Sequence, residues 1–314
     1  MAREREHGFD HLRALLVLLV VAGHFLELTG EQPLYRAIYL FHIPALLFLS
    51  GRYARFSARR LLGLLLTYAV FQVLYRLFDW LVLRQPQNVW NWLFVPYWHL
   101  WYLLALAVML ALTPLLEKIP GRFRVPAFLT SVCAALLWEF LPFSGYTLSF
   151  GRILSFFPFF LAGLYLKNYR PPCGKPRVAA LAVLAVAAIL GTVLFVRSAI
   201  PTALLYGAMN FARSGGTLPQ KAAVLALGFV WVALLFVLPW PTRSVPLWSA
   251  YGRHTLNVYL LHGFVVRLTE RFNLLPRSTA GALLFALVTT AALGLVPTRL
   301  PANCSFFEKS KNKD

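Results

Sequence analysis

Residues 9–24 read FDHLRALLVLLVVAGH and place Asp10, His11, Arg13 and His24 in an otherwise apolar stretch. On a helix that turns about 100° per residue, Arg13 and His24 fall within about 20° of each other and about 16 Å apart along the axis. An arginine suits a phosphate or pyrophosphate group, and a histidine suits proton transfer because its ordinary pKa lies near neutrality. The spacing leaves a second interpretation open, in which Arg13 anchors the helix at a membrane surface and His24 packs against another helix.

Two further histidines are expected at a similar depth. His42 lies in the next apolar stretch, which runs in the opposite direction, and His262 lies well inside a later one. Three histidines could bind a metal ion, but none has the spacing or the nearby cysteine or carboxylate that is typical of metal sites, so we predict no metal. Asp10 precedes Arg13 by one turn and could orient it through an i,i+3 pair.

The elements that must position these side chains are membrane spans. The chain of 314 residues is 59% hydrophobic and 13% charged, whereas soluble proteins are nearer half apolar and one quarter charged. We predict one integral membrane domain over residues 1–314, an all-α polytopic bundle of about ten spans, because apolar runs long enough to cross about 30 Å recur throughout. The first run lacks a small-residue cleavage site and is interpreted as a retained span. The predicted spans are 12–28, 37–50, 61–83, 98–116, 125–141, 149–166, 177–197, 222–239, 250–269 and 279–297.

Basic residues predict the orientation of the bundle. With the N-terminus in the cytoplasm, 20 Lys and Arg fall on the cytoplasmic side and 9 on the other, while Arg76 lies inside the third span. This asymmetry favours both termini in the cytoplasm. The basic residues that give the net charge of +19 lie between the apolar runs. They therefore indicate contact with anionic membrane lipids and no nucleic-acid partner. Three scattered cysteines indicate neither a disulfide framework nor a metal site.

Aromatic residues gather at the predicted outer edge of the fourth span. Four tryptophans, Trp90, Trp92, Trp98 and Trp101, fall within twelve residues. They are expected either in an aromatic belt at the membrane interface or in a sugar-binding site. His99 lies among them and is expected at the same outer interface.

Five landmarks in the sequence resemble one known family. They are Asp10-x-Leu-Arg13 followed by His24, FHIPALLFLSG at 41–51, HLWYLLAL at 99–106, FFPFFLAGLYL at 156–166 and YGRHTLNVYLLHGFV at 251–265. In this order the landmarks resemble the integral membrane acyltransferase-3 family of bacterial ten-span O-acyltransferases, and within it the compact O-acetyltransferases of fucose and enterobacterial common antigen. The resemblance covers nearly the whole chain, and the tail after Pro297 carries little of it.

The resemblance implies a multi-pass protein of the bacterial inner (cytoplasmic) membrane. It implies transfer of an acetyl group from cytoplasmic acetyl-CoA to a hydroxyl of a cell-envelope carbohydrate or lipid-linked glycan. His24 matches the family's essential histidine, as general base or transient acyl carrier, and Arg13 its essential arginine, as a ligand of the coenzyme A phosphates. His42 or His262 is a candidate to hold a second proton or to orient His24, and Asn257 or Tyr259 is a candidate oxyanion donor.

The family's Arg-x-x-Arg motif before the third span is matched imperfectly. Arg52 and Arg55 have the spacing but lie early, whereas Arg60 is followed by two leucines and Gly63. We therefore expect Arg52 and Arg55, and behind them Arg59 and Arg60, as secondary ligands of the coenzyme A phosphates.

A transporter or flippase of lipid-linked sugars, with the buried histidines as a proton pathway, is the competing function. Ten spans and ionisable groups at mid-membrane fit it equally well. The two halves of the sequence show no matching pair of spans broken by glycine or proline, which argues against the usual inverted repeat. A catalytically silent membrane partner is a third possibility. The sequence predicts neither the acceptor sugar nor the oligomeric state.

Overall fold

The computed structural model describes residues 7–30, 32–86, 88–142, 145–171, 173–240, 255–275 and 278–295. Within these ranges the chain is helical, without strands. The longer helices are α1 (His7–Thr29), α2 (Gln32–Arg52), α3 (Ala58–Leu81), α5 (Trp101–Glu117), α6 (Gly121–Leu137), α7 (Phe150–Tyr165), α8 (Lys175–Arg197), α11 (Leu218–Val237), α13 (Thr255–Arg271) and α14 (Thr279–Gly294). Short α-helices are α4 (Val89–Phe94), α9 (Ala203–Tyr206) and α10 (Phe211–Ser214), and short 3-10 helices are η1 (Trp98–Leu100), η2 (Trp138–Phe140) and η3 (Thr147–Ser149).

The prediction of an all-α polytopic membrane bundle is confirmed. In the described part of the chain, 8 helices are long and apolar enough to cross a membrane, and α14 is a shorter apolar helix. The predicted ninth span corresponds to α13, which has 17 residues and whose preceding residues 250–254 lie outside the described ranges. The total number of spans, the cytoplasmic location of both termini and the single domain over 1–314 stay predictions.

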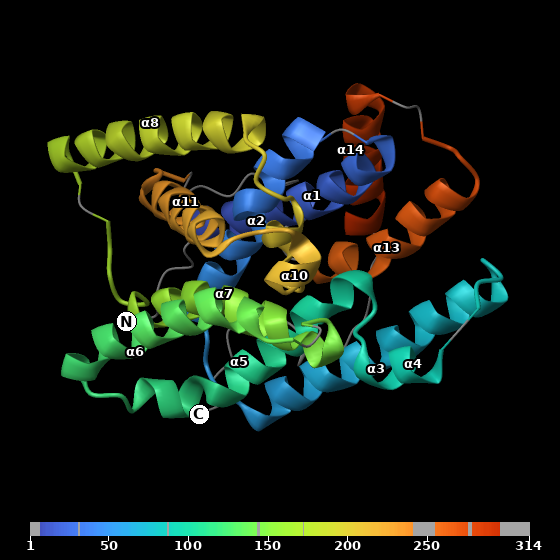
Figure 1. Ribbon diagram of the computed structural model, residues 1–314, viewed down its shortest axis with the longest axis horizontal. Coiled ribbons are helices and arrows are strands. Elements are labelled where there is room, and N and C mark those ends of the chain that lie inside the picture. Colours follow the sequence, from blue (N-terminus) through green and yellow to red (C-terminus); the bar gives the residue numbers. More distant parts are fainter. Residues whose placement is uncertain are drawn as a thin grey trace.

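The helices differ in how much of their surface the protein covers. Within the apolar window of each span, 67% of α1 and 72% of α2 is buried, against 17% for α3 and 11% for α8. The two buried helices therefore form the core of the bundle, and α3 and α8 lie at its periphery (Figure 1). Their exposed leucine, valine and isoleucine side chains are suited to contact with lipid.

The closest helix contact joins α2 to α7. A Cβ atom at Gly51 would overlap the carbonyl oxygen of Phe160, and one at Gly163 would overlap that of Phe48. Small residues at a membrane helix interface allow backbones to approach in this way. Pro44 lies inside α2 without ending the helix. The contact fixes the position of α7 against the core.

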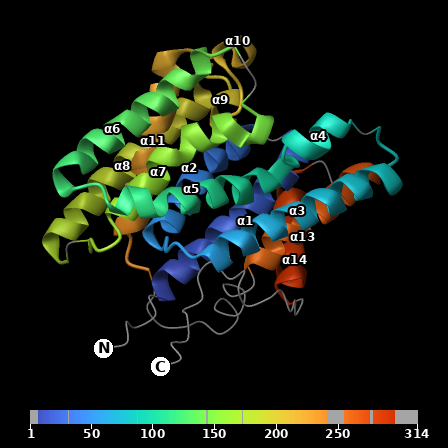
Figure 2. The ribbon, with the colours of Figure 1, turned by 90° about the horizontal axis from the view of Figure 1, so that it is seen from below.

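One end of the bundle carries the longer connections. Figure 2 shows α9 and α10 at its upper edge with α4 at the upper right, whereas α1 begins at the lower edge. Arg36 fastens part of this end, because its guanidinium donates hydrogen bonds of 2.8–3.2 Å to four carbonyl groups of residues 195–200 at the end of α8. A cation there also interacts favourably with the negative end of the helix dipole. The connection after α8 is thereby held against α2.

Candidate active site

A cavity of about 830 Å³ opens near the end of the bundle that carries α4 and α9. Its wall is built from α1, α2, α3, α5, α7, α9 and α13 and from the 95–99 segment. Three of its lining histidines are His24, His42 and His99. A concave site of this size with a few convergent polar groups is the usual form of a small-molecule site.

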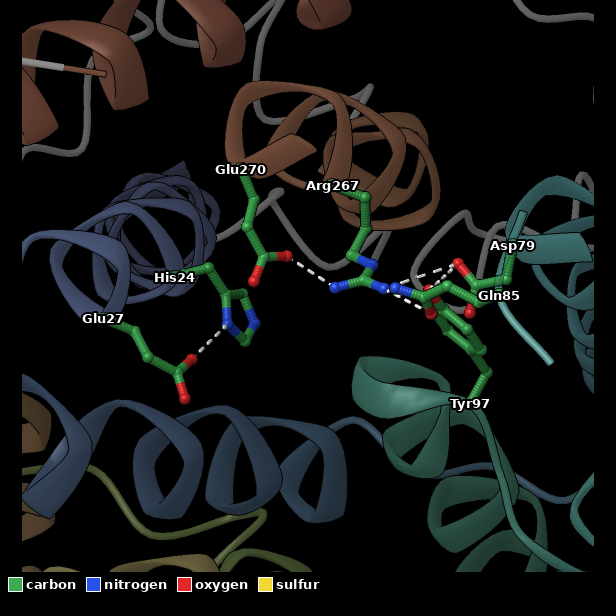
Figure 3. Close-up of polar contacts among 7 residues, drawn as sticks. All are labelled: His24, Glu27, Asp79, Gln85, Tyr97, Arg267 and Glu270. Atoms are coloured by element: carbon green, nitrogen blue, oxygen red, sulfur yellow. Dashed lines mark hydrogen bonds and ion pairs between the residues drawn. The ribbon is translucent and has the colours of Figure 1, made fainter. Parts of the chain in front are cut away.

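His24 lies near the end of α1 with polar groups beside one of its ring nitrogens. Its Nδ1 is 3.7 Å from Oε2 of Glu27, one turn further along the helix (Figure 3), and 3.3 Å from the hydroxyl of Tyr39. The ring centroid of Trp98 lies 4.1 Å from that of His24. The imidazole is thus held by a carboxylate, a phenol and an indole, and it is only 7% exposed.

Two more histidines pack against His24 and form with it the histidine cluster, defined as His24, His99 and His262. The rings of His24 and His262 are stacked at 5.4 Å, and those of His99 and His262 lie 4.6 Å apart. His262 donates from Nδ1 to the carbonyl oxygen of Val258 at 3.0 Å, and its Nε2 has no hydrogen-bond partner in the part of the chain described. The expected proximity of His24 and His262 is therefore present. No group of three metal-binding side chains arranged for an ion occurs among the described residues.

His42 lines the same cavity behind Tyr39. Its Nδ1 donates to the carbonyl oxygen of Ile38 at 2.8 Å, which fixes the ring to its own helix. The ring of Tyr39 lies 4.8 Å from that of His42 and 6.3 Å from that of His24. Tyr39 therefore contacts both His42 and His24, whereas His262 stacks directly against His24.

Helix α3 positions the segment that carries Trp98 and His99. Gln72 donates to the carbonyl oxygen of Val95 at 2.9 Å and accepts from the backbone N–H of Tyr97 at 2.7 Å. On the other side, the hydroxyl of Tyr259 donates to the carbonyl oxygen of His99. Tyr259, a candidate oxyanion donor by sequence, therefore has a backbone partner. His99, expected at the outer interface, is 4% exposed and lies inside the histidine cluster.

A charged network lies at the mouth of the cavity. Arg267 on α13 is 2.5 Å from a carboxylate oxygen of Glu270 and 3.7 Å from one of Asp79, and it donates to Gln85 at 2.9 Å (Figure 3). Tyr97 donates to the same oxygen of Asp79 at 3.0 Å. Charges of both signs are therefore paired at the mouth.

Helix α9 forms another part of the cavity wall. The hydroxyl groups of Tyr35 and Tyr206 lie 2.7 Å apart, which joins α9 to α2. Burial raises the pKa of the Tyr206 phenol above its ordinary value.

Arg13 lies toward the other end of α1 and is 7% exposed. Its Nη1 is 3.2 Å from Oδ1 of Asp10, so the expected i,i+3 pair is present. Tyr102 lines the cavity that contains His24, and its hydroxyl lies 2.9 Å from that of Ser50.

The arginines near the start of α3 have separate environments. Arg52 lies over the rings of Phe9 and Phe236 at 5.2 and 4.9 Å and donates to the carbonyl oxygen of Leu166 at 2.5 Å. It thereby ties the end of α2 to the end of α7. Arg55 and Arg59 are exposed, and Arg60 is partly buried. Arg52 packs against Phe9, which lies at the same end of α1 as Arg13. No described contact joins Arg55 or Arg59 to that end of α1.

Comparison with known proteins assigns the chain to a family. The profile of a family described as an acyltransferase domain matches residues 6–298, which is nearly the whole chain. The chain belongs to the acyltransferase-3 family. The chain is also 36% identical over 58 residues to the nodulation protein NolL of Sinorhizobium fredii, and the match spans 16% of this chain and 16% of that relative. No solved structure matches it. The protein is a multi-pass membrane protein of the acyltransferase-3 family.

The structure adds side chains to the surroundings of His24. Glu27 and Tyr39, which the sequence did not single out, contact it. Trp98 and His99, which the sequence predicted only at the outer edge of the fourth span, also lie beside it. The HLWYLLAL landmark contains His99 and was the available signal for it. Of the four tryptophans, Trp98 and Trp101 line the cavity, whereas Trp90 is 56% exposed on α4.

Proposed function

We propose that this acyltransferase transfers an acetyl group from cytoplasmic acetyl-CoA to a hydroxyl of a cell-envelope carbohydrate or lipid-linked glycan, in the bacterial inner membrane. The observation that carries the proposal is the environment of His24, a buried imidazole on the cavity wall whose Nδ1 lies beside Glu27 and Tyr39. A base oriented by a carboxylate through its other nitrogen is a recurring arrangement in acyl transfer. Nε2 is then the atom that meets the acceptor.

In the proposed reaction, Nε2 of His24 removes the proton from the acceptor hydroxyl. The hydroxyl oxygen attacks the thioester carbonyl, the new C–O bond forms, and the C–S bond breaks as the tetrahedral intermediate collapses. The proton on His24 passes to the leaving thiolate, which departs as coenzyme A. In the two-step variant, Nε2 attacks the thioester carbonyl, the C–N bond forms and the C–S bond breaks, and the thiolate leaves and takes up a proton as coenzyme A. The acceptor hydroxyl then attacks the acetyl group on the imidazole, the C–O bond forms and the C–N bond breaks, and the proton released by the hydroxyl balances the one taken up by the thiolate.

The donor is proposed to enter from the end where Arg13 lies. Arg13 would hold the coenzyme phosphates, with Arg52 as a secondary ligand and Arg55, Arg59 and Arg60 behind it. An extended pantetheine arm suits the separation of about 16 Å between Arg13 and His24 along α1. The hydroxyls of Tyr102 and Ser50, which lie 2.9 Å apart, are proposed to contact this arm.

The acceptor is proposed to occupy the cavity. Aromatic rings of Trp98, Trp101 and Tyr39 line it, and they suit the apolar C–H faces of a sugar ring. The cavity lies at the end of the bundle that the asymmetry of basic residues predicts to be extracytoplasmic. Donor and acceptor would then approach His24 from opposite sides of the membrane.

Release of coenzyme A by the purified full-length protein in lipid nanodiscs tests this function. Wild-type protein with acetyl-CoA is expected to produce free thiol, faster when an envelope glycan extract is added. His24→Ala should lose this activity, whereas His7→Ala should keep it, since His7 starts α1 about 25 Å along the axis from His24. Normal turnover by correctly inserted His24→Ala would contradict the proposal. Binding without turnover in wild-type protein would instead favour a silent partner, and proton-coupled sugar flux without thiol release a transporter.

A further inference from the structure

Arg152, in the first turn of α7, lies in the cavity wall between two aromatic rings. Its guanidinium carbon is 5.0 Å from the ring centroid of Trp101 and 4.9 Å from that of Tyr146. In the described part of the chain, no carboxylate lies within ion-pair distance of it, and its buried Nε has no hydrogen-bond partner. A largely buried guanidinium without a counter-charge is costly.

The other two arginines of the cavity have partners. Arg267 is paired with Asp79 and Glu270 at the mouth. Arg76 donates to carbonyl groups of the 91–95 segment at 2.9 and 3.0 Å. Among the described residues, Arg152 has neither a carboxylate partner like that of Arg267 nor carbonyl partners like those of Arg76.

Tyrosine side chains line the cavity together with Arg152. Tyr146 packs on the guanidinium, and Tyr39 and Tyr206 line the same cavity. The hydroxyl of Tyr39 lies 3.3 Å from Nδ1 of His24. Because Arg152, Tyr39 and His24 line one cavity, a ligand that fills this cavity can contact both Arg152 and His24.

We propose that Arg152 forms the anion subsite for the acceptor. It binds a negatively charged oxygen group of the acceptor, either a carboxylate on the sugar or a phosphate on its carrier, and the neighbouring sugar ring then presents its hydroxyl to His24. The proposal rests on the proposed acceptor cavity and adds the substrate class, an anionic acceptor. A guanidinium is suited to this task because its planar donors match the oxygen atoms of both groups.

Binding of three matched sugars tests the subsite without any acyl donor. The full-length protein, in nanodiscs of uncharged phosphatidylcholine, is titrated by calorimetry with methyl glucoside, methyl glucuronide and glucose 1-phosphate at constant ionic strength. At least one anionic sugar is expected to bind about tenfold more tightly than the neutral sugar, as charge-assisted hydrogen bonds allow. Preference for the glucuronide identifies a sugar carboxylate as the source of the charge, and preference for glucose 1-phosphate identifies a phosphate.

Variants assign any such preference to Arg152. Arg152→Gln should lower the affinity for the anionic sugar to that for methyl glucoside, and Arg152→Lys should keep part of the preference. Arg197→Gln, which removes an exposed charge at the end of α8, should leave the preference unchanged. Equal binding of neutral and anionic sugars by wild-type protein, or failure of both anionic sugars to bind, would overturn the proposal. So would a preference that persists in Arg152→Gln. Release of coenzyme A is measured separately, so failure of this subsite is distinguishable from failure of the acetyl-transfer function.

Discussion

The carboxylate of Glu27 lies 3.7 Å from Nδ1 of His24, one helical turn away on α1. The contact places a carboxylate beside Nδ1, and in the proposed reaction it orients the imidazole so that Nε2 acts as the base. We expect Glu27→Gln to lower kcat for coenzyme A release about tenfold, a small share of the effect of general base catalysis. The KM for acetyl-CoA should change little. Steady-state assays beside Glu117→Gln, a charge removed at the other end of the bundle, check this. A change confined to KM would contradict an orienting role.

The close approach of His99 to α13 depends on Gly263. A Cβ atom there would lie 2.6 Å from both the His99 ring and the hydroxyl of Tyr75. We expect Gly263→Ala to displace His99 and Trp98 and to lower acetyl transfer at least as strongly as Glu27→Gln, because a buried contact of this kind relaxes only by moving its neighbours. Gly121→Ala is the matched control, since nothing lies within 4 Å of its Cβ position. Equal activity of the two variants would show that the His99 position is unimportant.

Bidentate binding of phosphate by Arg13 predicts that lysine replaces it poorly. Arg13→Lys should raise the KM for acetyl-CoA about tenfold, because an ammonium group lacks the planar pair of donors. Arg122→Lys is the control, since this arginine is exposed in the first turn of α6. Comparing inhibition by coenzyme A with inhibition by dephospho-coenzyme A measures directly how much the phosphate contributes to binding. Full activity of Arg13→Lys would contradict bidentate binding and show that a positive charge at this position is sufficient.

A buried ion pair supports the wall formed by α9. Nζ of Lys221 is 2.5 Å from Oε1 of Glu139, with side-chain exposures of 4% and 0%, and it also donates to Ser155 and to the carbonyl oxygen of Leu204. Glu139→Gln leaves the lysine charge uncompensated and should lower the free energy of unfolding by about 3 kcal/mol.

The double variant Glu139→Gln with Lys221→Met is the control for this pair. It removes both charges and should recover most of the lost stability, because the desolvation cost of an unpaired charge disappears. Thermal unfolding in nanodiscs measures both variants. A double variant that is less stable than Glu139→Gln would contradict the account.

Local patterns predicted the helices and the pair on α1 well. Each apolar run specifies a span by its length, and the Asp10–Arg13 contact follows from helical spacing alone. The residues of other elements that contact His24 were harder to predict from the sequence. Trp98 and His99 reach it because Gln72 fastens the 95–99 segment to α3 and because Gly263 leaves room on α13. Such contacts depend on packing between elements far apart in the sequence, which hydrophobic periodicity does not encode.

Transfer of labelled acetyl groups tests the central role of His24 most directly. Inverted inner-membrane vesicles containing the full-length protein receive acetyl-CoA labelled in its acetyl group, and the envelope glycans are then analysed by mass spectrometry. The account predicts labelled acetyl esters on the glycans with wild-type protein and with His7→Ala, and none with His24→Ala at equal membrane abundance. Labelled glycans at the wild-type level in His24→Ala vesicles would contradict it.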